Sequence, residues 1–123
     1  MNPNKNIHQH LIRIHQLMND SLNAYKAYNQ NGKTYRFAKE LRKCNMEMIT
    51  LLQVDYIHHD EKLNDAANAL IEHYTIWRNK WDDMEATILP APDDVFIFEN
   101  EHRFPKWASE IFEAKLLKLT ENN

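Results

Sequence analysis

The sequence predicts an all-α fold, an antiparallel helical bundle, and three observations support that prediction. Gly32 is the single glycine, and neither glycine nor proline occurs between it and Pro90. This stretch is rich in Ala, Leu, Glu, Lys and Met, which favour helices. Apolar residues also recur at steps of three and four, as they do on the buried face of a helix. We expect one domain over residues 1–123, with three long helices, a shorter C-terminal helix, and an extended or briefly β crossover before the last helix.

The first expected helix carries a regular apolar face near the N-terminus. Its apolar positions are Ile7, Leu11, Ile14, Met18, Leu22, Tyr25 and Tyr28. The sequence Asn-Gln-Asn-Gly follows at 29–32. Gly32 there predicts the left-handed residue that commonly terminates a helix.

The second expected helix opens at Thr34, and the third has the most regular pattern in the chain. The apolar face of the second is Phe37, Leu41, Cys44, Met48, Leu51 and Leu52. The face of the third follows a heptad and consists of Leu63, Ala67, Leu70, Tyr74, Trp77, Trp81, Met84 and Ile88. A period of about 3.5 residues sustained over this length favours bundle packing at shallow angles.

The boundary between the second and third helices has two interpretations, because residues 54–65 contain neither glycine nor proline. Asp60 would cap a new helix by accepting hydrogen bonds from its first amides, with Glu61 well placed in the first turn. The alternative is a single kinked helix that runs through both segments. Its apolar stripe would need a partner chain to cover it.

The stretch 88–107, called the crossover below, is the least helix-like part of the sequence. Pro90 and Pro92 push the residues before them into extended conformations, and Val-Phe-Ile-Phe at 95–98 favours a strand. One possible arrangement is a small hairpin that turns at 99–101 and returns over His102, Arg103 and Phe104. The other is an extended segment that lies over the end of the bundle.

The last expected helix is short, about four turns. Pro105 suits its first position, where the missing amide hydrogen costs nothing. Its wide apolar arc consists of Trp107, Ala108, Ile111, Phe112, Leu116 and Leu119. A helix of this length does not match the third helix along its whole face.

Composition and charge narrow the possible functions. Cys44 is the single cysteine, so no internal disulfide forms, and no apolar run is long enough to span a membrane. The N-terminus has no apolar region typical of a secretory signal, so we expect a cytoplasmic protein without membrane contact. Residues 1–58 carry eight basic and four acidic residues, whereas residues 59–123 carry seven and fourteen. Complementary halves within one fold are the simplest interpretation, and pairing with a second copy or an acidic partner are the alternatives.

Candidate catalytic and metal-binding groups are few. Two ligands on one helix need a spacing of three or four residues, and the pair with that spacing, Glu99 and His102, lies in the crossover. A single glycine builds neither a nucleophile elbow nor a phosphate-binding loop. Asp55 falls on the apolar face of the second helix and would be a site candidate if buried. The simpler interpretation is that the face meets solvent there. We therefore expect no enzyme activity, no cofactor and no metal site, and we interpret Cys44 as a small core residue.

A basic cluster at the start of the second helix supports one alternative function, a nucleic-acid-associated regulator. The cations on the side opposite the apolar face are Lys33, Arg36, Lys39 and Lys43. Phosphate binding requires such a one-sided stripe. However, Glu40 and Glu47 interrupt it and no aromatic residue interleaves, so a solvated face is the simpler interpretation.

The leading functional prediction is a small non-catalytic interaction or regulatory protein that binds another protein and forms a homodimer. If the last helix is too short, another chain must bury part of the third helix. An isolated strand in the crossover would also offer unpaired backbone groups to a partner. The expected protein-contact residues are Trp77, Trp81, Met84, Val95, Phe96, Phe98 and Phe104. A metal-binding or small-ligand-binding bundle is the second alternative.

Overall fold

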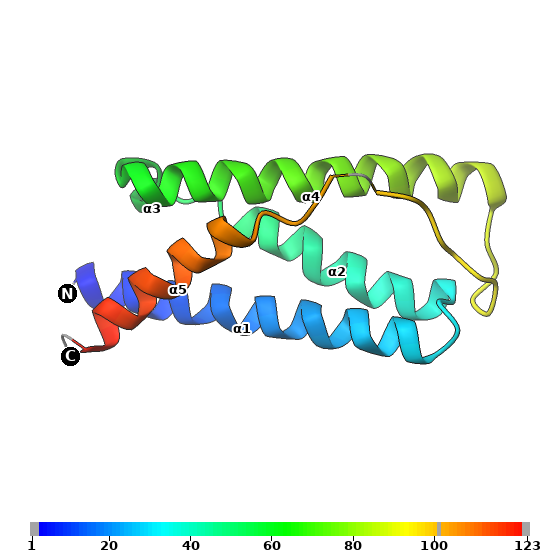
Figure 1. The fold of residues 1–123 in the computed structure, drawn as a ribbon, viewed down its shortest axis with the longest axis horizontal. Helices are drawn as coiled ribbons and strands as arrows, with labels where there is room; N and C mark the ends of the chain where they lie inside the picture. The colour runs from blue at the N-terminus through cyan, green and yellow to red at the C-terminus, as the bar shows by residue number, and fades with distance from the viewer. Residues whose placement is uncertain (1–2, 101, 122–123) are drawn as a thin grey trace.

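The computed structural model describes residues 3–100 and 102–121 (Figure 1). This part of the chain forms five helices, which are α1 (Pro3–Gln30), α2 (Tyr35–Leu51), α3 (Asp55–His59), α4 (Glu61–Ile88) and α5 (Lys106–Glu121). The long helices α1, α2 and α4 alternate in direction, and α5 returns toward the end of the molecule where both termini lie (Figure 1). The predicted all-α fold, with three long helices and a shorter last helix, is confirmed. None of the described helices is long and apolar enough to cross a membrane.

The turn between α1 and α2 lies where the sequence predicts it. Gly32 adopts a φ of 75°, which a glycine reaches without steric cost. The amide of Lys33 donates to the carbonyl of Tyr28 over 2.9 Å and closes the end of α1. Lys33 itself has a φ of 55°, so two successive left-handed residues turn the chain into α2.

The boundary between α2 and α4 is a real break, so the single kinked helix is wrong. Val54 is extended, and the five-residue helix α3 follows it before α4 begins. Ile57 on α3 is completely buried, which fixes this short helix against the core. Asp60 caps α4 as expected, because its Oδ1 accepts from the amide of Leu63 over 3.1 Å.

Within the crossover, residues 89–100 and 102–105 lie between α4 and α5, contain no helix and form no sheet with the other described residues. Val95 makes a single antiparallel bridge, and its partner is Thr34 at the start of α2. The expected hairpin is therefore wrong for the residues that the structure describes, because the crossover pairs with α2 instead of with itself. Residue 101 of the expected turn lies outside those residues. The last helix begins at Lys106, one residue after Pro105.

The crossover also supplies the cap of α2. The side chain of Thr34 makes no capping hydrogen bond. Instead, the first amides of α2, those of Tyr35 and Arg36, donate over 2.8 Å to the carbonyls of Asp94 and Pro92. The orphan amides at the start of this helix are thus satisfied by backbone far away in the sequence.

The core is divided into two clusters. The first lies toward the end where the termini meet and consists of Leu11, Ile14, Leu17, Met48, Leu52, Ile57, Leu63, Ala66, Ala67, Leu70, Tyr74, Ala108 and Phe112. The second consists of Ala38, Trp81 and Phe96, with Tyr28, Tyr35, Trp77, Met84 and Phe98 packed against it. Helix α5 contributes to the first cluster, and the crossover contributes to the second through Phe96.

Candidate functional site

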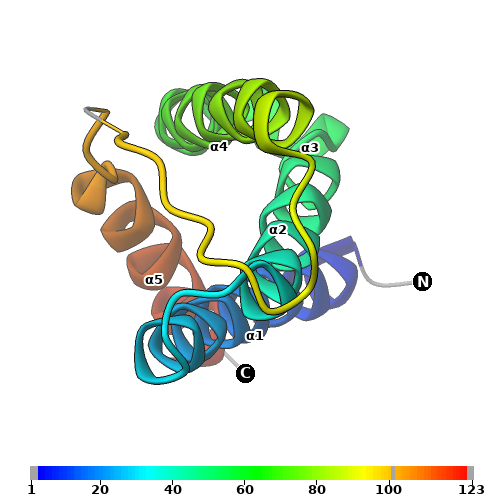
Figure 2. The same cartoon turned by 90° about the vertical axis from the view of Figure 1, so that its right-hand side faces the viewer.

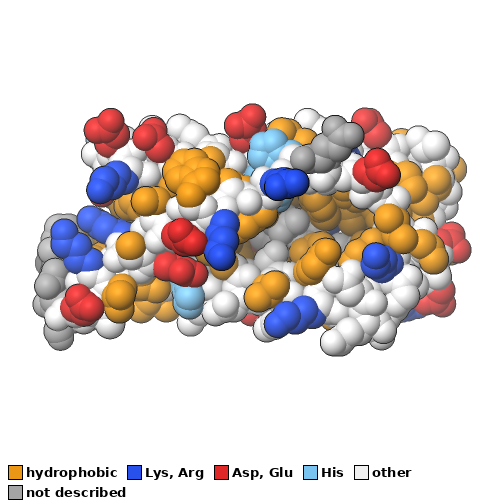
Figure 3. Space-filling model, viewed as in Figure 1, with side chains coloured by type: hydrophobic (Ala, Val, Ile, Leu, Met, Phe, Trp, Pro, Cys, Tyr) orange, Lys and Arg blue, Asp and Glu red, His pale blue; other side chains and the backbone are white. Residues whose placement is uncertain are grey.

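A cavity of about 740 Å³ is lined by members of both core clusters and is the candidate functional site. Nearly all of its lining residues come from α1, α2, α4, α5 and the crossover, and these elements are arranged in a ring in the end view of Figure 2. On the face shown in Figure 3, the molecule is hollowed between α1 and the crossover, and hydrophobic side chains line the hollow. Its volume is typical of pockets that hold small organic molecules, which measure about 300–1,000 Å³.

Eight of the 24 side chains that line this cavity, called the aromatic cavity below, are Tyr, Trp or Phe. They come from α1, α4 and the crossover, and they are Tyr25, Tyr28, Tyr74, Trp77, Trp81, Phe96, Phe98 and Phe104. Several pack on one another, and the ring centroids of Trp81 and Phe96 are 4.4 Å apart. Trp81 is further fixed because its indole N–H donates to the carboxylate of Glu85 over 3.0 Å. The wall is therefore held in place by the protein's own packing.

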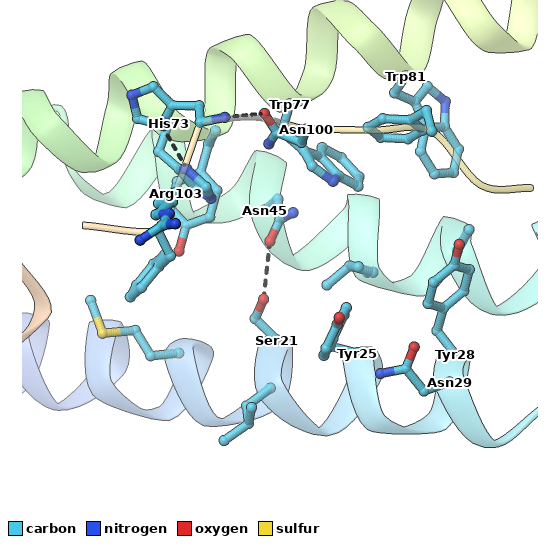
Figure 4. A pocket seen from close by; sticks show the side chains of 18 of the residues that line it. Ser21, Tyr25, Tyr28, Asn29, Asn45, His73, Trp77, Trp81, Asn100 and Arg103 are labelled. Carbon is cyan, nitrogen blue, oxygen red and sulfur yellow. Dashed lines mark hydrogen bonds between the residues drawn. The ribbon is translucent and has the colours of Figure 1, made fainter. Parts of the chain in front are cut away.

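Asn45 on α2 supplies the most deeply buried polar group of the cavity. It is 5% exposed, and within residues 3–100 and 102–121 it is the only buried polar residue. Its Oδ1 accepts a hydrogen bond from the hydroxyl of Ser21 on α1 over 3.0 Å. Figure 4 shows Nδ2 turned away from Ser21 toward the Trp77 side of the cavity. That nitrogen has two donor hydrogens and no hydrogen-bond partner among the described residues.

Two histidines meet at the other part of the wall. Nδ1 of His73 on α4 lies 3.0 Å from Nδ1 of His102 in the crossover. Burial lowers the pKa of His73, and the nearby charge of His102 lowers it further. Phe104 packs edge-on against His73, with centroids 5.4 Å apart. Arg103 lies beside this pair in Figure 4.

The mouth of the aromatic cavity combines exposed apolar residues with the exposed polar residues Asn19, Asn29, Lys33, Arg103 and Glu113. Four large hydrophobic residues that line the cavity are between 44% and 51% exposed, and these are Leu22, Tyr25, Ile97 and Phe104. Two lie on α1 and two on the crossover. An apolar patch that surrounds an opening is typical of a surface that binds something.

The structure brings five of the seven predicted protein-contact residues together in the cavity wall, namely Trp77, Trp81, Phe96, Phe98 and Phe104. Met84 packs against the second cluster, and Val95 is exposed at the edge of the crossover. Trp81 and Phe96 are each 1% exposed, so neither reaches the surface. Phe98 and Phe96 of the crossover pack on Trp77 and Trp81 of the predicted apolar stripe, and Ile88 at the end of that stripe is 40% exposed.

The sequence reasoning did not select Asn45, His73 or Tyr25. For Asn45 a signal was present, because it falls four residues after Leu41 and three before Met48, on an otherwise apolar face. Burying a polar residue in the middle of such a face costs free energy unless it forms a hydrogen bond, so its presence there marks it as a candidate functional residue. No comparable signal marks His73, whose neighbour His102 comes from the crossover.

The predicted basic face of α2 does not form one free surface. Arg36 pairs with Asp93 of the crossover at 3.2 Å. Lys39 lies over the ring of Tyr35, 5.1 Å from its centroid. Lys33 lines the aromatic cavity instead, and Lys43 is exposed at a separate, smaller hollow.

The remaining candidate residues have ordinary surroundings. Among residues 3–100 and 102–121 there is no group of three or more His, Cys, Asp or Glu side chains placed to hold a metal ion. Asp55 is exposed at the start of α3. Cys44 is half-buried against the first cluster, and burial raises the pKa of its thiol, with nearby carboxylates adding to the effect.

Comparison of the chain with protein-family models, with curated proteins and with solved structures gives no match. The candidate site is therefore defined by its own geometry and chemistry.

Proposed function

We propose that this protein is a non-catalytic binding protein that encloses a small, mostly apolar organic molecule in the aromatic cavity. The observation that carries the proposal is an open cavity of about 740 Å³ with eight aromatic side chains in its wall, into which Nδ2 of Asn45 presents a hydrogen-bond donor that stays accessible to solvent. Protein interiors are normally close-packed, and unfilled apolar space destabilises them. A cavity with a donor on its wall is a feature that packing alone does not explain.

The lining defines the general chemistry of the ligand. Aromatic walls favour a flat ring or a hydrocarbon body, since stacked and edge-on contacts with rings are both available. Nδ2 of Asn45 requires a hydrogen-bond acceptor, such as a carbonyl oxygen, a hydroxyl oxygen or a ring nitrogen. Of the two ligands considered in the second alternative, a small organic molecule or a metal ion, these features favour the small organic molecule.

A neutral fluorescent probe tests whether the cavity binds apolar molecules at all. We expect N-phenyl-1-naphthylamine to bind with one saturable site and to gain fluorescence as it leaves water. Ser21 lines the cavity, so Ser21→Phe should fill the space and abolish binding. Asn23 is exposed on the same helix and does not line the cavity, so Asn23→Phe is the matched control. Equal binding by the wild type and S21F, or no saturable binding by the wild type, would contradict the proposal.

Binding of another protein, including a second copy of this chain, is the second candidate function. The observation that favours it is the set of exposed apolar residues at the mouth, Leu22, Tyr25, Ile97 and Phe104. Aromatic and other large apolar residues are enriched in the centres of protein interfaces. Light scattering on a size-exclusion column should give a dimer mass that Ile97→Ser and Phe104→Ser reduce to the monomer. A monomer mass for the wild type would exclude the homodimer.

Two further predictions are tested independently. Nucleic-acid binding through Lys33, Arg36, Lys39 and Lys43 would give excess absorbance at 260 nm in the same column peak, and high salt would remove it. A cytoplasmic location is tested by fractionating cells that express the chain. Both experiments have outcomes that leave the cavity proposal intact.

A further inference from the structure

We infer that the ligand of the aromatic cavity is an organic anion, whose carboxylate lies beside His73, His102 and Arg103 and whose apolar body lies among the aromatic rings. The inference rests on the binding function proposed above and specifies the chemical class of the ligand. Three observations support it, namely the polarity of the cavity, the unpaired cation at one part of its wall, and the tautomers of the histidine pair.

The cavity has an aromatic part and a polar part. Trp77, Trp81 and Tyr28 lie toward one side in Figure 4, with Asn29 beside Tyr28, and Phe96 packs on Trp81. His73 and Arg103 lie together toward the other side, and Asn100 lies beside Trp77. Asn45 is located between these two groups. A molecule with an apolar body and one polar end therefore matches the lining better than a molecule of uniform polarity.

Arg103 has no ion-pair partner among the described residues. Arg78 shares this property within residues 3–100 and 102–121, whereas the guanidinium groups of Arg13, Arg36 and Arg42 pair with carboxylates; of the two unpaired arginines, only Arg103 lines the cavity. Arg103 is exposed and lines the cavity, so it is accessible to a ligand that enters from the mouth. A guanidinium group matches a carboxylate in shape, because it can donate two parallel hydrogen bonds.

The other charged residues of the lining are Lys33 and Glu113. Neither forms an ion pair within residues 3–100 and 102–121. The lining thus has two fixed cations and one carboxylate, a balance that favours an anionic ligand. Lys33, Arg103 and Glu113 are all exposed, so solvent screens all three charges and the excess of one cation remains.

The pair formed by His73 and His102 also offers a hydrogen-bond donor that its shared hydrogen bond does not use. With the two Nδ1 atoms 3.0 Å apart, one imidazole donates and the other accepts. The neutral imidazole that accepts at Nδ1 must carry its own proton at Nε2. Whichever histidine accepts, the pair therefore presents one Nε2–H group beyond the shared hydrogen bond. Uptake of a further proton by the pair would increase its positive charge.

Three probes with one carbon skeleton test the inference, and these are 4-phenylbutyrate, 4-phenylbutyramide and 4-phenylbutylamine. Each is titrated into the full chain at about pH 7.5 and constant ionic strength, with intrinsic tryptophan fluorescence as the signal; Trp107 is exposed outside the cavity, and Trp107→Phe leaves Trp77 and Trp81 as the emitting residues. We expect the carboxylate to bind about tenfold more tightly than the amide, since charge-assisted hydrogen bonds are about twice as strong as neutral ones. The amine should bind most weakly.

Variants assign the preference to one part of the cavity. Arg103→Gln should remove the preference for the acid and leave the affinity for the amide unchanged. Lys118 is exposed on α5 and does not line the cavity, so Lys118→Gln is the matched control and should change nothing. Both substitutions are at exposed positions, where they leave the fold intact.

The outcomes separate this inference from the proposal on which it rests. Equal binding of acid and amide would overturn the anion inference and leave the cavity as a binding site. An acid preference that survives R103Q would overturn the assignment to the His73–His102–Arg103 part and direct attention to Lys33. Failure of all three probes to bind would count against the cavity function itself.

Discussion

The hydroxyl of Ser21 on α1 donates a hydrogen bond to Oδ1 of Asn45 on α2 over 3.0 Å. In this arrangement Oδ1 of Asn45 faces Ser21 and Nδ2 faces the cavity. The hydrogen bond also joins α1 to α2 in the middle of the bundle, beside the space that divides the core. The pair therefore defines both the local packing and the donor offered to a ligand.

Replacing Asn45 with Leu should weaken binding without weakening the fold. Leu has the branched shape of Asn, and combining it with Ser21→Ala removes both partners of the hydrogen bond, an exchange that is often neutral or stabilising. We expect the free energy of unfolding of this double variant to be unchanged or up to about 1 kcal/mol higher, measured by urea denaturation. Ligands that need the Nδ2 donor should bind more weakly. A loss of stability greater than about 2 kcal/mol would show that Asn45 is structural.

Phe96 and its neighbour Ile97 should differ sharply in their effect on stability. Phe96 is 1% exposed and packs on Trp81, so Phe96→Ala should lower the free energy of unfolding by about 3–5 kcal/mol. Ile97 is 47% exposed, so Ile97→Ala should cost less than about 1 kcal/mol. Urea denaturation of both variants measures the contrast. Equal effects would mean that the crossover does not pack as described.

Asp60 should stabilise the protein in a pH-dependent way. The hydrogen bond from the amide of Leu63 lowers the pKa of the Asp60 carboxyl, burial opposes this, and Lys115 lowers the pKa further. Because the folded-state pKa is depressed, the contribution is complete above the pKa of the unfolded chain, about 3.9, and is lost as the pH falls through the folded value. Asp60→Ala should cost about 1 kcal/mol at pH 7.

The difference between the wild type and D60A should shrink as the pH falls below about 4. Denaturation by urea at a series of pH values measures it. Asp65 is exposed one turn later on α4, and Asp65→Ala is the control, with an effect within about 0.5 kcal/mol. A difference that does not change with pH would show that the ionised form is not the one that caps α4.

His73 should make the fold less stable in mild acid. Burial keeps its pKa below the usual value, so the unfolded chain binds the proton more readily than the folded protein. The contribution of neutral His73 to the free energy of unfolding is complete above about pH 6.5. It is lost as the pH falls toward and through the lower pKa of the folded state.

Urea denaturation between about pH 8 and about pH 5, an interval that spans the usual pKa of histidine, measures this effect. His73→Gln should reduce the fall in the free energy of unfolding over that interval. His59 is exposed at the end of α3, so His59→Gln should leave the pH dependence as it is in the wild type. Identical pH profiles for H73Q and the wild type would contradict the role given to His73.

The helix boundaries set by local chemistry were predictable from the sequence. Gly32 terminates α1 because a glycine tolerates the left-handed conformation, and Asp60 caps α4 because its side chain reaches the amide of Leu63. Both depend on residues close in the sequence. The apolar stripe of α4 was equally visible, since its spacing alone defines it.

What covers that stripe was not predictable in the same way. Backbone carbonyls at Pro92 and Asp94 hold the crossover to α2, and a carbonyl carries no residue-specific signature. The short helix α3 depends on the burial of Ile57, which is a property of the assembled core. The cavity depends on a volume that the surrounding helices leave unfilled, and periodicity identifies faces rather than volumes.

The capping of α2 by the crossover has a consequence during synthesis of the chain. Residues 35 and 36 are synthesised well before residues 92–94, so the first amides of α2 have no backbone acceptors until the crossover has been made. In the same way Trp81 cannot pack on Phe96, nor the first cluster on Phe112 of α5, until those later residues have been synthesised. A nascent chain that ends near residue 88 therefore exposes its aromatic stripe. This interval is when the polypeptide is most prone to aggregate or to need a chaperone.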